Sequence, residues 1–187
     1  MTRLALFASG NGTNVQQIAE YFIGNPNVKV EIVILNKKNA FAGERAARLG
    51  IDSVYFNRND FYQSDNVLNC LIERRIDYII LAGFLWLVPD NLLTHFESKI
   101  LNIHPALLPA YGGKGMYGHY VHEAVVANGE RISGISIHLV NKEYDKGRIL
   151  FQATCPLSAE DTPDDLAAKV HLLEKAYFPS LIAAWLR

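Results

Sequence analysis

Two polar side chains lie two positions apart at the end of an apolar segment, residues 101–109, which reads LNIHPALLP. In a strand, alternate side chains share a face, so Asn102 and His104 point the same way. Pro105 cannot continue a central strand, so the strand ends there. An amide that donates to a developing oxyanion and an imidazole that handles protons indicate general acid–base chemistry. The alternative is structural: an asparagine that ties down a loop and a histidine satisfied by the backbone.

A second polar segment, residues 9–14, reads SGNGTN and follows a short apolar run. Its glycines allow a tight turn and close approach to a ligand, and the free N–H groups of a following helix favour an anion. It is neither the dinucleotide fingerprint, because Val15 replaces the third glycine, nor a P-loop. We predict that it binds the terminal phosphate of a small molecule through Gly10, Asn11, Gly12, Thr13 and Asn14. The alternative is an ordinary strand–helix turn capped by Thr13.

The connection over residues 141–148, NKEYDKGR, contains two carboxylates. A carboxylate beside His104 would stabilise the imidazolium and fix the orientation of the ring. Spacing alone does not choose among Glu143, Asp145 and neither, since the segment also fits a charged, solvated connection between strands.

Residues 82–89, AGFLWLVP, form an apolar loop after another predicted strand. The loop could line a pocket for a flat heterocycle such as a pterin, or it could simply belong to the core. The pattern His119-x-x-His122-Glu123 resembles a metal pair only loosely and is not HExxH, so we predict no metal site.

The elements that must position these groups alternate between strands and helices. Apolar and β-branched runs predict strands over residues 4–8, 28–35, 53–56, 77–82, 99–103, 133–140 and 149–154. Helical spacing predicts helices over residues 13–22, 40–49, 65–75, 89–96 and 120–127, and a last helix that opens at 162–165, is interrupted at Pro179 and continues to the end. This order predicts an α/β fold: a doubly wound, mostly parallel, Rossmann-like sheet with a late antiparallel hairpin.

Composition bounds the function. The chain has 187 residues, 50% of them hydrophobic, and we expect a single domain over 1–187. A net charge of −1 argues against a long nucleic acid as partner, whereas a small anion needs only a local pocket. We expect no signal peptide and no membrane span. Cys70 and Cys155 are predicted to be free thiols, which fits the cytoplasm.

Taken together, the motifs resemble the phosphoribosylglycinamide formyltransferases, folate-dependent enzymes of purine synthesis. The likeness runs from residue 4 to about residue 185. It rests on SGNGTN at 9–14, LAGFLWLVP at 81–89, LNIHPALLP at 101–109, GISIHLV at 134–140 and the YDKG turn at 144–147.

The resemblance implies the formyltransferase fold and a specific reaction. The amine of glycinamide ribonucleotide would attack the formyl carbon of 10-formyltetrahydrofolate, giving formylglycinamide ribonucleotide and tetrahydrofolate in de novo purine biosynthesis. Asn102, His104 and Asp145 match the family's catalytic residues: Asn102 for the oxyanion, and His104, supported by Asp145, for charge and proton transfer. The formyl donor is a cosubstrate, and no metal is implied. The expected assembly is a monomer or homodimer.

The resemblance also implies contacts with both substrates. For glycinamide ribonucleotide it adds Gly83, Pro105 and Glu174, the last at the ribose, to the phosphate turn at 10–14. For the folate it implies Arg58, Leu85, Trp86, Leu87, Val140, Asn141 and Tyr144.

The chain departs from the family at three places. Trp86 stands where the family can carry arginine, and Arg58 is the basic residue available around 58–63. The glycine-rich segment 112–118 is longer than a short Gly-x-His stretch, and His119 aligns with that histidine.

Three other functions remain open. A 10-formyltetrahydrofolate hydrolase would use the same three residues with water, but water needs no phosphate clamp, and those enzymes usually carry a further N-terminal domain. A tRNA formyltransferase would have a basic face and a further C-terminal domain. A non-catalytic folate- or nucleotide-binding protein on the same scaffold would tolerate a broken catalytic triad.

Overall fold

The computed structural model describes residues 1–186. It contains two compact units, Met1–Leu101 and Asn102–Trp185. That the chain forms a single catalytic domain stays a prediction. No helix within residues 1–186 is both long enough and apolar enough to cross a membrane.

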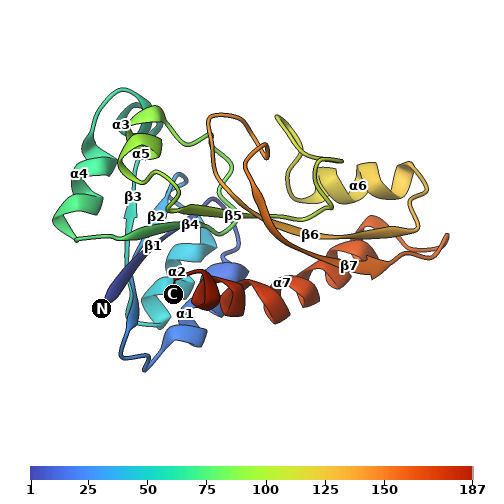
Figure 1. Ribbon diagram of the computed structural model, residues 1–187, viewed down its shortest axis with the longest axis horizontal. Helices are drawn as coiled ribbons and strands as arrows, with labels where there is room; N and C mark the ends of the chain where they lie inside the picture. The colour runs from blue at the N-terminus through green and yellow to red at the C-terminus, as the bar shows by residue number, and fades with distance from the viewer. Residues whose placement is uncertain (187) are drawn as a thin grey trace. The chain divides into compact units, whose positions relative to one another are not determined.

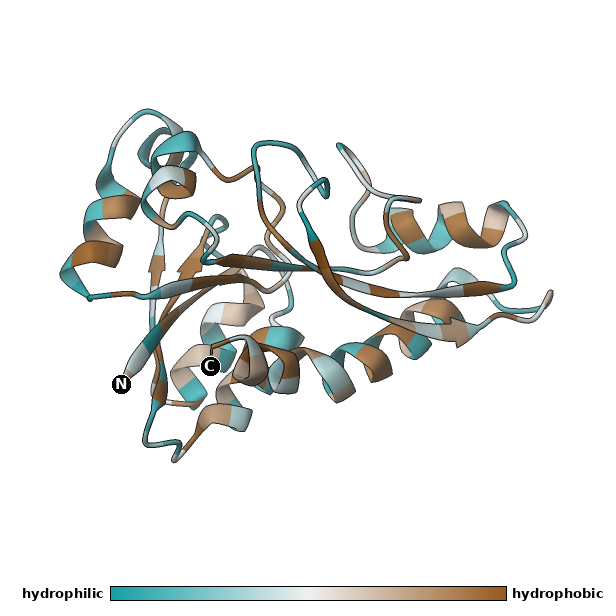
Figure 2. Cartoon of the chain, in the orientation of Figure 1, coloured by the Kyte–Doolittle hydropathy of each residue, from teal (hydrophilic) through white to brown (hydrophobic). Residues whose placement is uncertain are grey.

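The first unit alternates strands and helices, as the sequence predicts. Its elements are β1 (Thr2–Ala8), α1 (Thr13–Phe22), β2 (Val28–Leu35), α2 (Phe41–Arg48), β3 (Asp52–Tyr55), α3 (Arg58–Tyr62), α4 (Asn66–Glu73), β4 (Tyr78–Leu81) and α5 (Asp90–His95). The strands pair in parallel in the order β3-β2-β1-β4. Helices α1 and α2 lie on one side of them and α3, α4 and α5 on the other (Figure 1). Strand β1 is consequently apolar along most of its length, and residues 4–8 are fully buried (Figure 2).

The strand order places a switch point at the centre of this unit. The chain passes from β1 to β2 and β3 on one side, and then returns to β4 on the other side of β1. Open α/β sheets bind ligands at such a point, beyond the carboxyl ends of the strands. The loops after β1 and β4 leave from there and are tied together: Ser9 N donates to Gly83 O (3.0 Å), and Leu85 N donates to Ser9 Oγ (2.9 Å).

The second unit carries the predicted hairpin. Its elements are the end of β5 (Ile100–His104), α6 (His119–Ala127), β6 (Ile132–Leu139), β7 (Ile149–Pro156) and α7 (Pro163–Trp185). Strands β6 and β7 pair antiparallel, and α7 packs against both strands and against α6. Gly134 allows the two strands to approach, because a Cβ there would lie 1.9 Å from Ala153 O.

The predicted interruption of the last helix at Pro179 is wrong, because α7 continues through this residue to Trp185. Proline removes one N–H donor, but it sits on the buried stripe with Phe178 and Ile182, and this packing holds the helix together. The Ser180 hydroxyl also donates to Tyr177 O (3.0 Å) in the adjacent turn. The final residue, Arg187, lies outside the described residues.

The beginning of α7 agrees with its prediction. Asp165 N donates to Thr162 Oγ1 (3.2 Å) and Thr162 N donates to Asp165 Oδ2 (2.9 Å), a reciprocal cap. By contrast, α5 begins one residue later than expected, with Pro89 at its N-cap. Helix α3 was not predicted from periodicity, since its start depends on the Asn57 side chain, which accepts from Asn59 N (2.8 Å) and Asp60 N (3.0 Å).

Candidate active site

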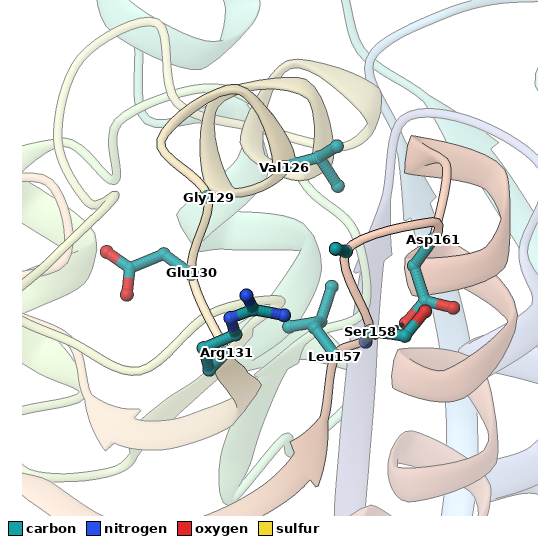
Figure 3. A pocket seen from close by; sticks show the side chains of 8 residues that line it. Val126, Gly129, Glu130, Arg131, Leu157, Ser158 and Asp161 are labelled. Carbon is teal, nitrogen blue, oxygen red and sulfur yellow. Dashed lines mark hydrogen bonds between the residues drawn. The ribbon is translucent and has the colours of Figure 1, made fainter.

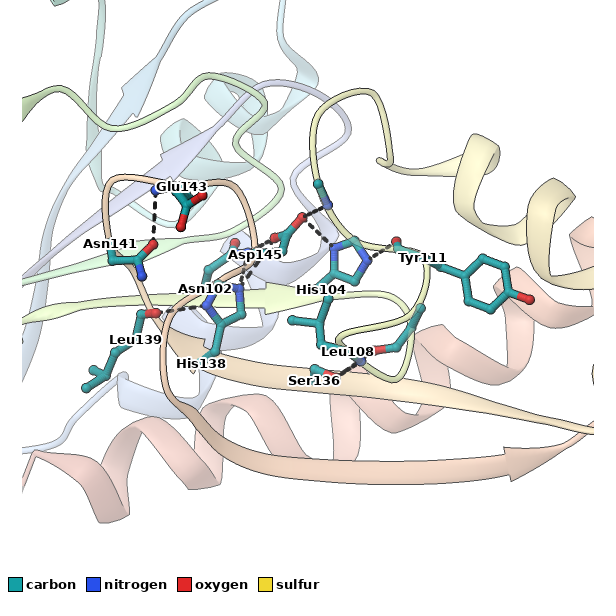
Figure 4. A network of polar contacts seen from close by, with 12 residues as sticks. Asn102, His104, Leu108, Tyr111, Ser136, His138, Leu139, Asn141, Glu143 and Asp145 are labelled. Carbon is teal, nitrogen blue, oxygen red and sulfur yellow. Dashed lines mark hydrogen bonds and ion pairs between the residues drawn. The ribbon is translucent and has the colours of Figure 1, made fainter.

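The end of β5 presents an amide and an imidazole, as the sequence predicts. Asn102 is half-buried and His104 is buried. Both meet one carboxylate from the connection between β6 and β7: His104 Nδ1 lies 3.5 Å from Asp145 Oδ2, and Asn102 Nδ2 donates to Asp145 Oδ1 at 3.4 Å (Figure 4). The exposed Glu143, the other carboxylate left open by the sequence, has its backbone N–H bound to Asn141 Oδ1 (3.0 Å). The structure therefore pairs His104 with Asp145.

The backbone around Asp145 is shaped to deliver this carboxylate. Asp145 has a left-handed conformation (φ 55°), which is costly for a residue with a side chain. Gly113 N donates to Asp145 Oδ2 (3.0 Å), and a Cβ on Gly112 would lie 3.2 Å from Asp145 Cβ and 2.5 Å from Leu108 Cδ2. The glycine-rich segment thus contacts the carboxylate through backbone that only glycine allows.

His104 faces a hydrogen-bond acceptor on each side. Its Nε2 donates to Tyr111 O (2.7 Å), while Nδ1 faces Asp145. Burial lowers the pKa of His104 below its ordinary value and His138 adds to this, against the raising effects of Asp145 and the Tyr111 carbonyl. Burial would raise the pKa of Asp145, but its polar contact with His138, the charge of His104 and the Gly113 N–H bring it below its ordinary value. The site therefore holds an ionised carboxylate beside a ring that can gain and lose a proton.

His138 is a member of this cluster to which the sequence assigned no role. It is buried on β6, with Nε2 3.0 Å from Asn102 Nδ2 and 3.5 Å from Asp145 Oδ1. A histidine on an apolar strand more often has a structural role in the core. Only the position of His138 just before the acidic connection could have indicated that it belongs to the site.

Ser136 holds the turn that follows His104 through hydrogen bonds to its backbone. This fully buried hydroxyl on β6 donates to Ala106 O (2.7 Å) and accepts from Leu108 N (2.9 Å). Gln152 on β7 donates to Ser136 Oγ (2.7 Å) and to Leu108 O (3.1 Å). Two strands of the hairpin therefore fix the loop that begins at Pro105.

In the first unit, the glycine turn before α1 depends on Gly12. This residue is the helix N-cap in a left-handed conformation (φ 77°), and a Cβ there would lie 2.4 Å from Ala42 Cα. Thr13 is the first residue of the helix, so the alternative in which Thr13 caps it is wrong. The N–H groups of the first turn of α1 are left for a ligand or for water.

The side chain of Arg45, which was not predicted from the sequence, holds this turn in place. Arg45 on α2 donates from Nε to Asn11 O (2.9 Å) and from Nη2 to Asn11 Oδ1 (3.2 Å), and also bonds Gln16. Asn11 in turn donates to Thr13 Oγ1 (3.3 Å). Asn14 Oδ1 is buried and has no partner. Because Arg45 is distant in sequence from the turn, no local pattern connects the two.

The apolar loop after β4 divides between core and surface. Phe84 is buried against Phe7 and Phe61, with ring centroids 5.2 and 5.3 Å away. Leu85, Trp86 and Leu87 are half-buried. The Phe84 part of this loop is therefore core, and the next three residues form the part that a ligand could reach.

Arg58 and Trp86, both predicted to contact the folate, lie together in the first unit. The Arg58 guanidinium is 5.8 Å from the Trp86 ring centroid and 5.0 Å from that of Tyr62. The Tyr62 hydroxyl donates to Leu87 O (3.0 Å) and fixes the loop. These three side chains form an aromatic and cationic surface.

The remaining predicted residues fall on both units. Gly83, exposed and with φ 79°, follows β4, whereas Pro105, Val140, Asn141 and Tyr144 flank β5 and β6. Glu174 on α7 is buried and accepts from His171 Nδ1 (2.9 Å). This bond raises the pKa of His171 against the effect of burial.

The metal-ligating side chains and the hollows of residues 1–186 also bear on the site. No group of three or more His, Cys, Asp or Glu side chains in this part of the chain could hold a metal ion. A small hollow of about 120 Å³ in the second unit is lined by Arg131, Leu157 and Asp161 among others (Figure 3). It contains none of the predicted site residues.

Comparison with known proteins defines the class. The family model described as formyl transferase matches residues 2–182, and the chain belongs to this family. A protein of Escherichia coli named phosphoribosylglycinamide formyltransferase is 33% identical over 97% of the chain and 85% of its own length. One of Arabidopsis thaliana with that name, marked chloroplastic, is 41% identical over 97% of the chain. The chain spans 64% of that relative's length and 60% of its counterpart in Vigna unguiculata.

Solved structures agree with this assignment. The phosphoribosylglycinamide formyltransferase of Streptococcus pneumoniae superposes with a TM-score of 0.88 at 34% identity, covering 100% of both chains. Glycinamide ribonucleotide transformylase 1 of Symbiobacterium toebii gives the same TM-score at 32% identity over 97% of this chain and 86% of its own. These matches confirm the predicted resemblance and fold class.

Proposed function

We propose that the protein transfers the formyl group of 10-formyltetrahydrofolate to the amine of glycinamide ribonucleotide. The observation that carries this proposal is the single carboxylate of Asp145, which contacts both the Asn102 amide and the His104 ring at the end of β5. An oxyanion donor, a proton carrier and a charge that supports it are the groups that acyl transfer to an amine needs.

In the proposed mechanism, the substrate amine attacks the formyl carbon and a tetrahedral intermediate forms. Asn102 Nδ2 donates to its oxyanion, a type of contact whose removal typically costs about 2.7–4 kcal/mol of transition-state stabilisation. The attacking nitrogen loses a proton, the bond from the formyl carbon to N10 of the folate breaks, and N10 gains a proton. His104 carries this proton, and Asp145 stabilises the imidazolium.

We assign the turn at 10–14 to the phosphate of glycinamide ribonucleotide, Glu174 to its ribose, and Gly83 and Pro105 to the same substrate. The free N–H groups at the start of α1, beside Arg45, support the phosphate assignment. For the folate we assign the surface of Arg58 and Trp86, the loop residues Leu85 and Leu87, and Val140, Asn141 and Tyr144.

An absorbance assay of folate deformylation, with and without glycinamide ribonucleotide, tests the function. Turnover that depends on the amine supports the transferase. Turnover that is equal without the amine would identify a hydrolase instead, and no turnover in either case would leave a binding protein. The glycine turn favours the first outcome, because a water acceptor needs no phosphate clamp.

We further propose that residues 1–187 form one catalytic domain, a monomer or homodimer, that works in the cytoplasm. The family model crosses both compact units, and the free thiols Cys70 and Cys155 suit a reducing compartment. Light scattering of the purified protein would decide the assembly. Fractionation of the source cells would decide the compartment, since two relatives are named as chloroplastic.

A further inference from the structure

His138 is a buried titratable group that the proposed mechanism does not use. Both of its ring nitrogens have polar neighbours: Nδ1 lies 2.9 Å from its neighbour's carbonyl, Leu139 O, and Nε2 lies 3.0 Å from Asn102 Nδ2 (Figure 4). The ring therefore connects the backbone of β6 to the amide that is assigned to the oxyanion.

The partners fix the tautomer of His138. A carbonyl oxygen can only accept, so Nδ1 carries the proton. A neutral imidazole has one N–H, so Nε2 presents its lone pair to the Asn102 NH₂ group, which can only donate. The contact at 3.0 Å is then an ordinary hydrogen bond.

The opposite orientation of the Asn102 amide is disfavoured by Asp145. Turning the amide would place Oδ1 where Nδ2 now lies, 3.4 Å from Asp145 Oδ1. An amide oxygen would then face a carboxylate that is ionised at neutral pH, one acceptor against another. His138 Nε2 and Asp145 Oδ1 therefore both select the NH₂ group.

We propose that His138, as the neutral Nδ1–H tautomer, is a positioning residue that holds the Asn102 amide in the orientation that donates to the oxyanion. One N–H of Asn102 binds His138, and the other makes only a long contact of 3.4 Å with Asp145, which an oxyanion can replace. The inference rests on the proposed function, since it assigns His138 to the same formyl transfer.

Nitrogen-15 NMR of the ligand-free wild-type protein tests the tautomer without any assay of activity. We expect a protonated Nδ1 and an unprotonated Nε2 for His138 at pH 7.5. A protonated Nε2 at this pH would overturn the proposal. This result is independent of turnover, so an enzyme without amine-dependent activity would refute the proposed function and leave the tautomer measurement standing.

Two variants test the effect on catalysis. His138→Phe keeps a ring but has no acceptor, and we expect kcat to fall about 10²-fold while KM values change less than about threefold, as for a misplaced catalytic group. His138→Gln offers an acceptor near the Nε2 position, so it should recover most of kcat.

Ile137→Val is the matched control, because Ile137 is fully buried next to His138 on β6 and its side chain has no polar atom. It should lower thermal stability and leave kcat unchanged. Wild-type kcat in His138→Phe, or a His138→Gln variant as impaired as His138→Phe, would overturn the proposal. If His138→Phe does not fold, the kcat of His138→Gln and the NMR tautomer decide.

Discussion

At the scale of single residues, Asp145 connects the groups of the candidate site. Its two oxygens contact Asn102, His104 and His138, and the backbone N–H of Gly113 adds a further donor. A half-buried carboxylate with this many partners stays ionised at neutral pH, and it can orient its neighbours without taking up a proton itself.

Asn102→Ala should lower kcat/KM by about 10²–10³-fold, because the oxyanion loses a donor in the transition state. Steady-state kinetics with glycinamide ribonucleotide measure the effect. Circular dichroism checks that the variant folds, as expected for a half-buried side chain. A variant that retains wild-type kcat/KM would remove Asn102 from the mechanism.

The pairing of His104 with Asp145 shows where sequence reasoning ends. Alternation along a strand predicts that Asn102 and His104 share a face, because that rule is local. The choice between Asp145 and Glu143 depends on a left-handed backbone at residue 145 and on Gly113, which lies on another loop. The contacts of Arg45 and His138 likewise join positions far apart in the sequence, so neither residue was predicted.

At the scale of elements, most strands and helices were predictable from periodicity and capping residues. Short helix α3 was not, because a capping box at Asn57 defines its start and a single turn shows no period. Helix α7 passes Pro179 because tertiary packing outweighs a local helix-breaking preference.

Gly12→Ala should destabilise the protein by about 1–3 kcal/mol, through a left-handed backbone and a clash with Ala42. It should also raise KM for glycinamide ribonucleotide, since the turn would move. Chemical denaturation and kinetics measure both effects. Gly24→Ala is the control, because Gly24 has a similar left-handed backbone (φ 75°) but nothing lies within 4 Å of a Cβ there. Equal effects of the two substitutions would contradict this account of the turn.

The packing of α6 against α7 should respond to acid through His122. Burial lowers the pKa of this side chain from 6.5 to about 4, and the charge of His171 adds to the shift. Because the folded-state pKa lies below the unfolded one, the stabilising effect is present above pH 6.5 and is lost as the pH falls toward 4. We expect a loss of about 2 kcal/mol between pH 7 and pH 5 from this group.

Urea denaturation at the two pH values measures this loss. His122→Gln should reduce the difference in unfolding free energy by that amount, whereas His95→Gln, which removes an exposed imidazole, should leave it as in the wild type. An unchanged difference in His122→Gln would show that His122 does not resist protonation in the folded state.

At the scale of the whole molecule, the resemblance to a known family indicates substrates, which the physical properties of a single sequence do not. Composition and alternation predict an α/β protein without strong affinity for polyanions, but they leave the substrate open. The two proposed substrates come from the family whose motifs occur in both compact units, and each unit contains residues that we assign to these substrates.

Glycinamide ribonucleotide should stabilise the folded protein, since only the folded state forms the phosphate turn. At 100 times its Kd the expected gain is about 2.7 kcal/mol, visible as an increase in Tm. Gly12→Ala should lose this increase, and Gly24→Ala should keep it. An equal increase in all three proteins would place the phosphate elsewhere.

The contact of Ser136 with the turn after His104 has a consequence for engineering. The nonapeptide at 101–109 does not hold its own conformation, because Ser136 and Gln152 bind its backbone from two other strands. Transplanting the nonapeptide alone into another scaffold would transfer Asn102 and His104 without the contacts that hold the backbone around them. The smallest portable unit therefore includes the hairpin of β6 and β7, a discontinuous module rather than a linear motif.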